Sequence, residues 1–424
     1  PRAEMNPVLL KPVSDCGSQV IVNGRVVRNM RAAEYYEYKK SLVPVIKEAF
    51  DKLRSENDII VIEGAGSPAE INLKDGDIVN MGLAEMTDAP VLLVGDIDRG
   101  GVFAQLLGTL DLLDKSERAR VCGLVINKFR GDKALLEPGL EIIRQKAGIP
   151  ISGVVPYTDL TLDDEDSLSD RFAEKSAKAF DIAVIKLPHI SNFTDFEVFG
   201  QAEDVSVRFI SDVRQFGDPD IVILPGTKNT VGDMNWLNES GMADSVKKYA
   251  GSGGTVIGIC GGYQMLGRTV SDPDNLECGG DISGLSLLPV DTVLKDNKIR
   301  RLYKGNLSDP SGVLGPLKGA EVSGYEIHMG ETVPFEDLAE FTSDRTGYCR
   351  GNIYGSYVHG LFDEKDIAKG IIELVSGRRG RSVNTDGILD QAQFKEKQYD
   401  LLADCLRDNL DIDKIYDIMS IKKG

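Results

Sequence analysis

The chain has 424 residues, of which 42% are hydrophobic and 27% charged, and its formal net charge is −18. This composition is typical of a globular protein, and the length corresponds to two or three domains. The negative charge argues against nucleic acid or an anionic membrane surface as a partner, because both are bound through clustered lysine and arginine. A small-molecule substrate is therefore the expected partner.

Six cysteines are scattered along the chain without a Cys-x-x-Cys pair: Cys16, Cys122, Cys260, Cys278, Cys349 and Cys405. This pattern predicts neither a zinc site nor a disulfide framework, and it indicates a reducing compartment such as the cytoplasm. No apolar run approaches the ~18–20 residues of a membrane span, and the N-terminus lacks the pattern of a signal peptide. Because the sequence starts at Pro1 without an initiator methionine, we expect a fragment of a longer protein.

Short β-branched runs alternate with longer helical patterns between residues 58 and 156. The expected strands are DIIVIEGAG (58–66), PVLLVGDID (90–98), VCGLVINKF (121–129) and ISGVVP (151–156), and the expected helices lie in 101–118 and 133–148. Strands that alternate with helices predict a parallel sheet covered by the helices. The acidic stretch 159–170 is typical of a linker.

A second α/β unit is predicted from the runs DIAVIKLPH (181–189), DIVILPG (220–226) and TVIGIC (255–260). Three later runs, in 285–294, 323–330 and 351–360, are closer together and predict locally joined strands. From about residue 364 the chain is charged and helical in period. We therefore expect two α/β domains, over 1–165 and 181–370, and a C-terminal helical segment over 371–424.

The stretch GICGGYQMLG (258–267) places Cys260 between a predicted strand and a predicted helix. This is the arrangement of a nucleophile elbow, in which the side chain is exposed at a sharp turn and glycines permit the strained backbone. The helix N-terminus favours the thiolate, and the adjacent N–H groups can stabilise an oxyanion. The alternative is that Cys260 is a small buried residue after a glycine-rich turn. For the other five cysteines we keep the interpretation that they are structural.

A cysteine nucleophile needs a base, and the chain has three histidines. His359 ends the run GNIYGSYVHG, so we expect it at a strand end, facing the top of the sheet. His328 lies inside EIHMG and is more typical of a histidine within a strand. His189 follows a strand and could line a pocket without acting on Cys260.

The motif GICGGYQ with a later histidine at a strand end resembles the class I glutamine amidotransferases, in which cysteine takes the γ-acyl group of glutamine and ammonia is released. The resemblance implies Cys260 and His359 as catalytic residues, and Gly226, Thr227, Gly261 and Gln264 as oxyanion or glutamine-binding residues. The segment LPGTKNT (224–230) resembles the oxyanion loop of that class. Class I enzymes usually have His-Pro-Glu, whereas Gly360 and Leu361 follow His359, so the group that orients the imidazole is not identified.

Further motifs, from MNPVLLKP (5–12) to GYEIHMG (324–330), resemble the cobyric acid synthase family over almost the whole chain. The others are GSQVIVNGRVV (17–27), VIEGAGSPAEINL (61–73), GDIDRGGVFAQ (95–105) and INKFRGD (126–132). The resemblance implies a P-loop NTPase-like domain of the dethiobiotin synthetase type followed by the amidotransferase domain. It also implies glutamine- and ATP-dependent amidation of adenosylcobyrinic acid a,c-diamide to cobyric acid in cobalamin biosynthesis. The alternatives are a cobyrinic acid a,c-diamide synthase and an ATP-independent cysteine amidase.

For the ATP-dependent step the resemblance implies ATP as cosubstrate and Mg²⁺ as cofactor. It implies Glu63 as the magnesium ligand, Asp98 as a substrate or phosphate-side residue and Asn127 as an adenine contact. Asp96 lies at the end of the same predicted strand as Asp98. Each of these polar residues at a strand end could instead be a cap or part of a polar turn. The dipeptide Gly-Lys of a phosphate-binding loop is absent. We therefore expect an N-terminally truncated synthetase domain with weakened binding of Mg-ATP.

Overall fold

The computed structural model describes residues 2–14, 17–162, 176–277 and 279–420. Two compact units make up the chain: unit 1 comprises Pro1–Leu160 and Asp400–Gly424, and unit 2 comprises Thr161–Tyr399. Cys16, Cys278 and residues 163–170 of the predicted linker lie outside the described residues. Among the helices that are described, none is long and apolar enough to cross a membrane.

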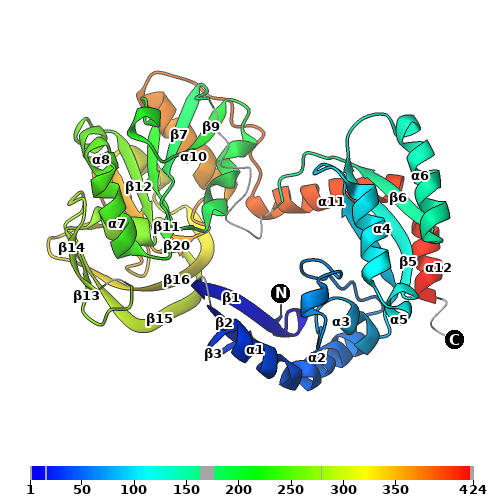
Figure 1. The fold of residues 1–424 in the computed structure, drawn as a ribbon. Helices are drawn as coiled ribbons and strands as arrows, with labels where there is room; N and C mark the ends of the chain where they lie inside the picture. The colour runs from blue at the N-terminus through cyan, green and yellow to red at the C-terminus, as the bar shows by residue number, and fades with distance from the viewer. Residues whose placement is uncertain (1, 15–16, 163–175, 278, 421–424) are drawn as a thin grey trace. The chain divides into compact units, whose positions relative to one another are not determined.

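Unit 1 contains two three-stranded sheets, an antiparallel one in the order β1-β2-β3 and a parallel one in the order β4-β5-β6 (Figure 1). The elements before residue 90 are η1 (Ala3–Met5), β1 (Val8–Ser14), β2 (Gly17–Val22), β3 (Arg25–Arg31), α1 (Ala32–Tyr38), η2 (Lys39–Leu42), α2 (Val43–Glu56), η3 (Ile71–Leu73) and α3 (Met81–Met86). The elements that follow are β4 (Val91–Asp96), α4 (Val102–Leu112), α5 (Lys115–Arg118), β5 (Val121–Phe129), α6 (Lys133–Ala147) and β6 (Ile151–Pro156).

The predicted alternation of strands and helices is confirmed for β4, α4, β5, α6 and β6. Leu106 of α4 and Leu140 of α6 are buried in one cluster with Ile126 of β5, so both helices pack on this strand. Because the strands are parallel, their carboxyl ends meet at one edge, where Asp96 and Asn127 lie opposite each other in register.

The predicted strand at 58–66 is not formed. Residues 59–65 carry no regular structure, and Val61 is 91% exposed. A β-branched run becomes a strand only when neighbouring backbone groups pair with it. Among the described strands, β4 pairs with β5 alone, and Val94 of β4 is 57% exposed. The prediction of a strand from the apolar pattern is therefore wrong, and among the described residues no strand lies beside this run to pair with it.

The predicted C-terminal segment is helical, and its helices are shared between the two units. Helix α10 (Lys365–Arg378) buries Ile371 and Ile372 in the core of unit 2. Helices α11 (Gln391–Asn409) and α12 (Ile412–Ser420) follow. The N–H of Asp411 donates to the carbonyl of Ser152 at 2.7 Å, so the chain between α11 and α12 lies along the edge strand β6 of unit 1.

Unit 2 is built on a seven-stranded sheet in the order β17-β18-β19-β12-β10-β7-β9, parallel from β19 to β9. Its first elements are β7 (Phe180–Ile185), β8 (Ile190–Ser191), η5 (Phe193–Gln201), β9 (Val205–Ile210), η6 (Val213–Gln215), β10 (Ile221–Leu224), β11 (Gly226–Thr227), α7 (Thr230–Glu239), α8 (Met242–Gly251), β12 (Thr255–Ile259) and α9 (Gly261–Leu266). Then come β13 (Thr269–Asp272), β14 (Gly280–Ser283), β15 (Val290–Asn306), η7 (Gly312–Leu317), β16 (Glu321–Pro334), β17 (Ala339–Thr342), β18 (Gly347–Arg350), β19 (Ile353–Ser356) and β20 (Val358–His359).

Both faces of this sheet are covered, because alternate residues of the parallel strands point to opposite sides. Ile182 and Val184 of β7 lie in a core cluster with residues of η5, η7 and α10. Ala183 and Ile185 lie in a second cluster with residues of α7 and α8. Figure 1 shows α7 and α8 beside β12. The predicted α/β architecture of this unit is therefore confirmed.

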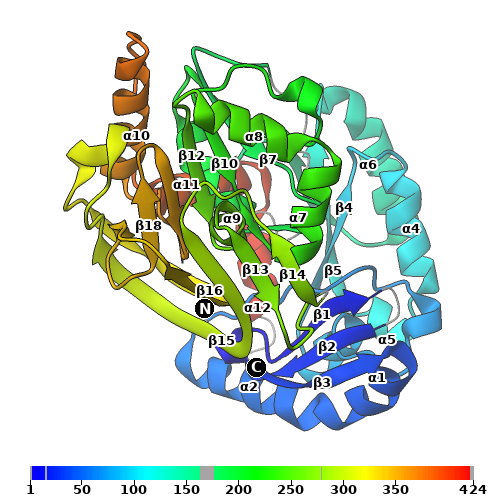
Figure 2. The same ribbon diagram turned by 90° about the vertical axis from the view of Figure 1, so that its left-hand side faces the viewer.

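A five-stranded sheet in the order β14-β13-β15-β16-β20 flanks the main sheet. Figure 2 shows its long hairpin of β15 and β16. Strand β20 adds to β16 with His359 opposite Tyr325. The carboxyl ends of β10, β12 and β19 meet beside this hairpin. In open α/β sheets this edge is where ligands bind.

Candidate active site

Cys260 occupies the predicted turn between β12 and α9. Its backbone has φ 51° and ψ −111°, a combination that non-glycine residues rarely adopt. A Cβ on Gly262 would lie 2.0 Å from the carbonyl oxygen of Leu224, and one on Gly258 would lie 2.7 Å from that of Gly262. These glycines are therefore required for α9 to pack closely against β10 and β12. Backbone strain of this kind is concentrated at functional sites.

The segment Gly226–Thr227 forms strand β11, which pairs with β8 and lies against the first turn of α9. A Cβ on Gly261 would be 3.2 Å from the backbone nitrogen of Thr227. The first N–H groups of a helix have no acceptor within the helix. The N–H of Gly261 is one of them, directly after Cys260, and can therefore donate to an oxyanion that forms beside the thiol.

Asp233 holds β11 in place from α7. Its carboxylate accepts hydrogen bonds from the Thr227 hydroxyl and from the backbone N–H of His189, at 3.2 Å. The His189 ring also lies 2.7 Å from this carboxylate through Nδ1. His189 thus supports the loop beside Cys260, in agreement with its predicted place outside the catalytic pair.

His359 lies at the end of β20 and is 1% exposed. Its Nδ1 lies 2.7 Å from Oδ2 of Asp195, and its ring is close enough to Cys260 to interact with it electrostatically. Burial opposes the charged form of the imidazole, but the Asp195 carboxylate and Cys260 outweigh it and raise the pKa of His359 to about 10. The imidazole is therefore protonated at neutral pH, which places a positive charge beside the Cys260 sulfur.

Asp195 is the carboxylate that contacts Nδ1 of His359, and no motif in the sequence indicates it. It lies on η5, and its second oxygen, Oδ1, accepts a hydrogen bond of 3.2 Å from the N–H of Gly360. Asp195 is 164 residues away from His359 in the chain. The residues around it, SNFTDF (191–196), form no motif that would distinguish Asp195 from an ordinary aspartate at the start of a helix. The signal that could have indicated it is its position in the short helix that follows β8, the strand that pairs with β11.

Gln264 lies one turn of α9 beyond Cys260 and is buried. Its Oε1 accepts from the hydroxyl of Thr230 at 2.8 Å, and its Nε2 donates to the hydroxyl of Tyr357 at 3.3 Å. Tyr357 in turn hydrogen-bonds to Thr332 of β16. This buried polar chain connects the helix after the nucleophile to the strand that passes it. The carbonyl oxygen of Ile327, on the same strand, lies 3.6 Å from the Cys260 sulfur.

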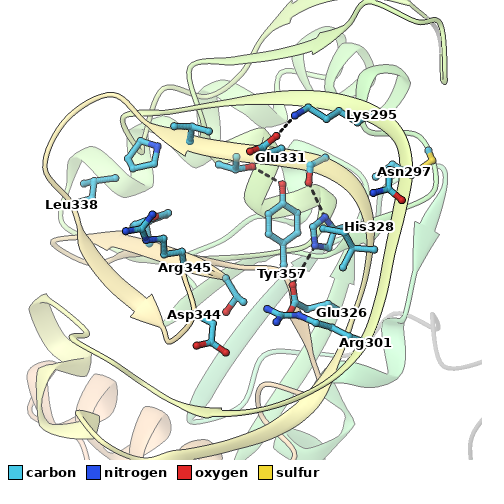
Figure 3. Close-up of a pocket in the computed structure, with 18 of the residues that line it drawn as sticks. Lys295, Asn297, Arg301, Glu326, His328, Glu331, Leu338, Asp344, Arg345 and Tyr357 are labelled. Carbon is cyan, nitrogen blue, oxygen red and sulfur yellow. Dashed lines mark hydrogen bonds and ion pairs between the residues drawn. The ribbon is translucent and has the colours of Figure 1, made fainter.

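His328 lies at a separate cavity of about 730 Å³ beside the β15–β16 hairpin (Figure 3). Its ring stacks on Tyr357 with centroids 3.7 Å apart, and its nitrogens face the Gly330 carbonyl at 2.8 Å and the Glu326 carboxylate at 3.3 Å. Glu326 is also paired with Arg301 at 2.6 Å. Both nitrogens of His328 thus have partners other than Cys260, which agrees with its predicted place within a strand.

In unit 1, two of the residues expected at an ATP site lie near cationic side chains. Asp98 pairs with Arg130 at 2.9 Å, and Asp96 pairs with Lys128 at 3.0 Å. Burial disfavours the ionised form of Asp96, but hydrogen bonds from Lys128 and from the Asp98 N–H outweigh it, and the pKa of Asp96 is lowered. The Asn127 side chain accepts from the N–H of Lys128 at 2.9 Å.

Glu63 lies in the exposed stretch that was expected to be a strand. Within the described ranges, no group of three or more His, Cys, Asp or Glu side chains is arranged to hold a metal ion. The role of Glu63 as a metal ligand stays a prediction.

The close approach of β11 to His359 gives a testable expectation for Gly226. A Cβ at this position would lie 3.1 Å from Cε1 of the His359 ring and 3.2 Å from the Ser191 hydroxyl. We expect Gly226→Ala to displace the imidazole and to lower the rate of any reaction that uses the Cys260–His359 pair by about 10-fold or more, since misplacement of a reacting group by a fraction of an ångström is costly. Gly251→Ala, where a Cβ meets open space, is the control in steady-state kinetics.

Comparison with known proteins identifies the two units. Residues 181–367 match a CobB/CobQ-like glutamine amidotransferase domain, and residues 25–164 match an AAA domain. The chain is thus a glutamine amidotransferase joined to a domain of a class that uses ATP, which makes it an enzyme that hydrolyses glutamine.

Curated relatives cover nearly all of the chain. Cobyric acid synthase of Lachnoclostridium phytofermentans is 51% identical over 99% of this chain and 86% of its own length. The cobyric acid synthase of Ruminiclostridium cellulolyticum is 48% identical, with 99% and 84% covered, and that of Thermoanaerobacter sp. is 46% identical, with 99% and 85% covered. The chain belongs to the cobyric acid synthase family.

Proposed function

We propose that Cys260 and His359 are the catalytic pair with which this amidotransferase releases ammonia from glutamine, and that Asp195 positions His359. The observation that carries this proposal is the position of the buried His359 ring, which is hydrogen-bonded to Asp195 and interacts electrostatically with Cys260. The protonated imidazole stabilises the Cys260 thiolate, which is the nucleophilic form of cysteine. Gly226, Thr227, Gly261 and Gln264 are proposed to surround the glutamine side chain.

The chemistry follows from these positions. The thiolate attacks the γ-carboxamide carbon of glutamine, and the negative charge on its oxygen is stabilised by the N–H of Gly261 and by the adjacent β11 backbone. His359 donates its proton to the leaving nitrogen as the carbon–nitrogen bond breaks, so ammonia and a γ-glutamyl thioester are formed. Water then attacks the thioester, His359 takes up a proton, and glutamate is released with the thiolate restored.

The ammonia is used in an ATP-dependent amidation. The chain amidates peripheral carboxylates of adenosylcobyrinic acid a,c-diamide and gives cobyric acid, a step of cobalamin biosynthesis. A carboxylate becomes reactive toward ammonia when it attacks the γ-phosphorus of ATP, which gives an acyl phosphate and ADP. Ammonia then displaces phosphate and forms the amide.

Unit 1 is proposed as the ATP-using part, with Asp98 and Asn127 near the nucleotide. Asp98 follows β4, and Asn127 lies near the end of β5, at the carboxyl edge of the parallel sheet, where such folds bind ligands. Mg²⁺ is proposed to accompany ATP, because it is usually held by one or two carboxylates together with the phosphates. Glu63 is the carboxylate proposed for it.

The test is to measure glutamate, ammonia and corrinoid amides formed from glutamine, with and without ATP and adenosylcobyrinic acid a,c-diamide. Amidation of the corrinoid that requires both glutamine and ATP is expected. Cobyrinic acid, supplied in a parallel reaction, should be a poor acceptor. Glutamine hydrolysis with no amide formed under any condition would instead indicate an ATP-independent amidase.

A further inference from the structure

Tyr325 is the outermost residue of the group around His359. It lies on β16 directly opposite His359 of β20, and the two rings stack with centroids 5.2 Å apart and an interplanar angle of 22°. Tyr325 is 38% exposed, whereas His359 is 1% exposed. The preceding Gly324 permits this contact, because a Cβ there would lie 2.1 Å from the His359 carbonyl oxygen. The tyrosine ring therefore lies on the solvent side of the imidazole.

The hydroxyl of Tyr325 is fixed by Asn192, whose side-chain amide donates to it. Asn192 has a left-handed backbone, φ 54°, and directly precedes η5, the helix that carries Asp195. The N–H of Asp195 donates to the Asn192 carbonyl at 3.1 Å. A left-handed conformation is tolerated best by asparagine among residues with a side chain. Asn192, which binds Tyr325, and Asp195, which binds His359, therefore belong to the same turn.

These contacts close a ring of four side chains and backbone groups. Asn192 binds Tyr325, Tyr325 stacks on His359, His359 binds Asp195, and Asp195 binds back to Asn192. The members come from three segments, at 192–195, 325 and 359. In such a ring each contact restricts the others, so the orientation of the imidazole depends on Tyr325 as well as on Asp195.

We propose that Tyr325, anchored by Asn192, is a positioning residue that holds the imidazole of His359 between Asp195 and Cys260. The proposal rests on the proposed function of the Cys260–His359 pair. The aromatic face stabilises the protonated ring that lies against it, as aromatic rings do for adjacent cations. Burial and the Asp195 charge raise the pKa of Tyr325 to about 12, so its phenol stays neutral while His359 is charged. Because Tyr325 acts through His359, its loss should affect the rate of the chemical step.

The experiment compares Tyr325→Phe and Tyr325→Leu with the wild-type chain in steady-state hydrolysis of glutamine. Tyr325→Leu should lower kcat by about 3- to 10-fold, the value of one aromatic stacking contact, with KM changed less than about twofold. Tyr325→Phe keeps the stacking ring and should recover most of the loss. Asn192→Ala should resemble Tyr325→Phe. Tyr399→Leu, an exposed tyrosine of α11, is the matched control and should match the wild type.

Three outcomes would overturn the proposal. A Leu variant with unchanged kcat would remove the positioning role, and a raised KM at constant kcat would make Tyr325 a substrate-binding residue. A Phe variant as slow as the Leu variant would show that the ring does not carry the effect. If Tyr325→Leu fails to fold, Tyr325→Met, which also lacks the ring, replaces it, and an unchanged kcat in that variant would contradict the positioning role. Failure of the wild type to hydrolyse glutamine would instead overturn the proposed function and this inference with it.

Discussion

Replacement of Cys260 by serine should abolish the hydrolysis of glutamine, with a fall in kcat of at least about 10³-fold. A serine hydroxyl is a much weaker nucleophile than a cysteine sulfur and remains protonated at neutral pH. The variant should also fail to react with 6-diazo-5-oxo-L-norleucine, a glutamine analogue that alkylates the nucleophile, as measured by mass spectrometry of the intact chain. Ammonium chloride should restore whatever amide formation the wild-type chain supports, because ammonia bypasses the missing step.

The matched control is Cys349→Ala. Cys349 is buried, lies in the same unit on β18, and has a thiol whose pKa is raised by burial. Its sulfur accepts from the N–H of Ser311 at 3.3 Å. This variant should hydrolyse glutamine at the wild-type rate. Equal losses with glutamine and with ammonium in Cys260→Ser would show that Cys260 is structural.

The sequence indicated Cys260 and His359 because each lies at a local boundary that has a recognisable pattern. A strand, a cysteine between glycines and a helix follow one another within about a dozen residues, and His359 ends an apolar run before a glycine. The structure brings Cys260, which follows β12 of the main sheet, close to His359, which lies on β20 of the five-stranded sheet shortly after β19. Local patterns of this kind can be read from one sequence.

Asp195 and Glu63 show where local patterns stop being informative. Asp195 acts on a residue 164 positions away, and that contact exists only because η5 and β20 meet in the folded unit. The run before Glu63 has the composition of a strand, but a strand also needs a neighbour, and β4 pairs only with β5 among the described strands. In both cases the deciding interaction is between segments that are distant in sequence.

Asp195→Asn is expected to lower glutamine hydrolysis at neutral pH by about 10²-fold, within the range of one positioned proton-transfer group. The asparagine keeps the size of the side chain but cannot supply the negative charge that, together with Cys260, outweighs the burial of His359. The imidazole of the variant should therefore lose its proton at a lower pH than in the wild type. Since the leaving nitrogen takes its proton from His359, the alkaline limb of the kcat profile should shift toward neutral pH.

The sign of the stability effect follows from the same shift. The folded-state pKa of His359, about 10, is above the usual value of a free histidine, so protonated His359 stabilises the folded state fully below the pKa of the unfolded chain. This contribution is lost as the pH rises through the range up to about 10. In thermal unfolding, the loss of stability caused by Asp195→Asn should be largest at acidic to neutral pH, where His359 of the wild type is protonated. The difference in the free energy of unfolding between variant and wild type should shrink as the pH rises toward 10.

Asp212→Asn separates this effect from the general loss of a carboxylate. Asp212 pairs with Arg214 at the surface, and hydrogen bonds from the Arg214 side chain and backbone lower its pKa to about 2. Its replacement should leave the alkaline limb and the kcat unchanged. An Asp195→Asn enzyme with the wild-type pH profile would mean that His359 is charged without help from Asp195. The Cys260 thiolate alone would then have to offset the effect of burial on the pKa of His359. In that case the double variant Cys260→Ser, Asp195→Asn would be no less stable than Cys260→Ser.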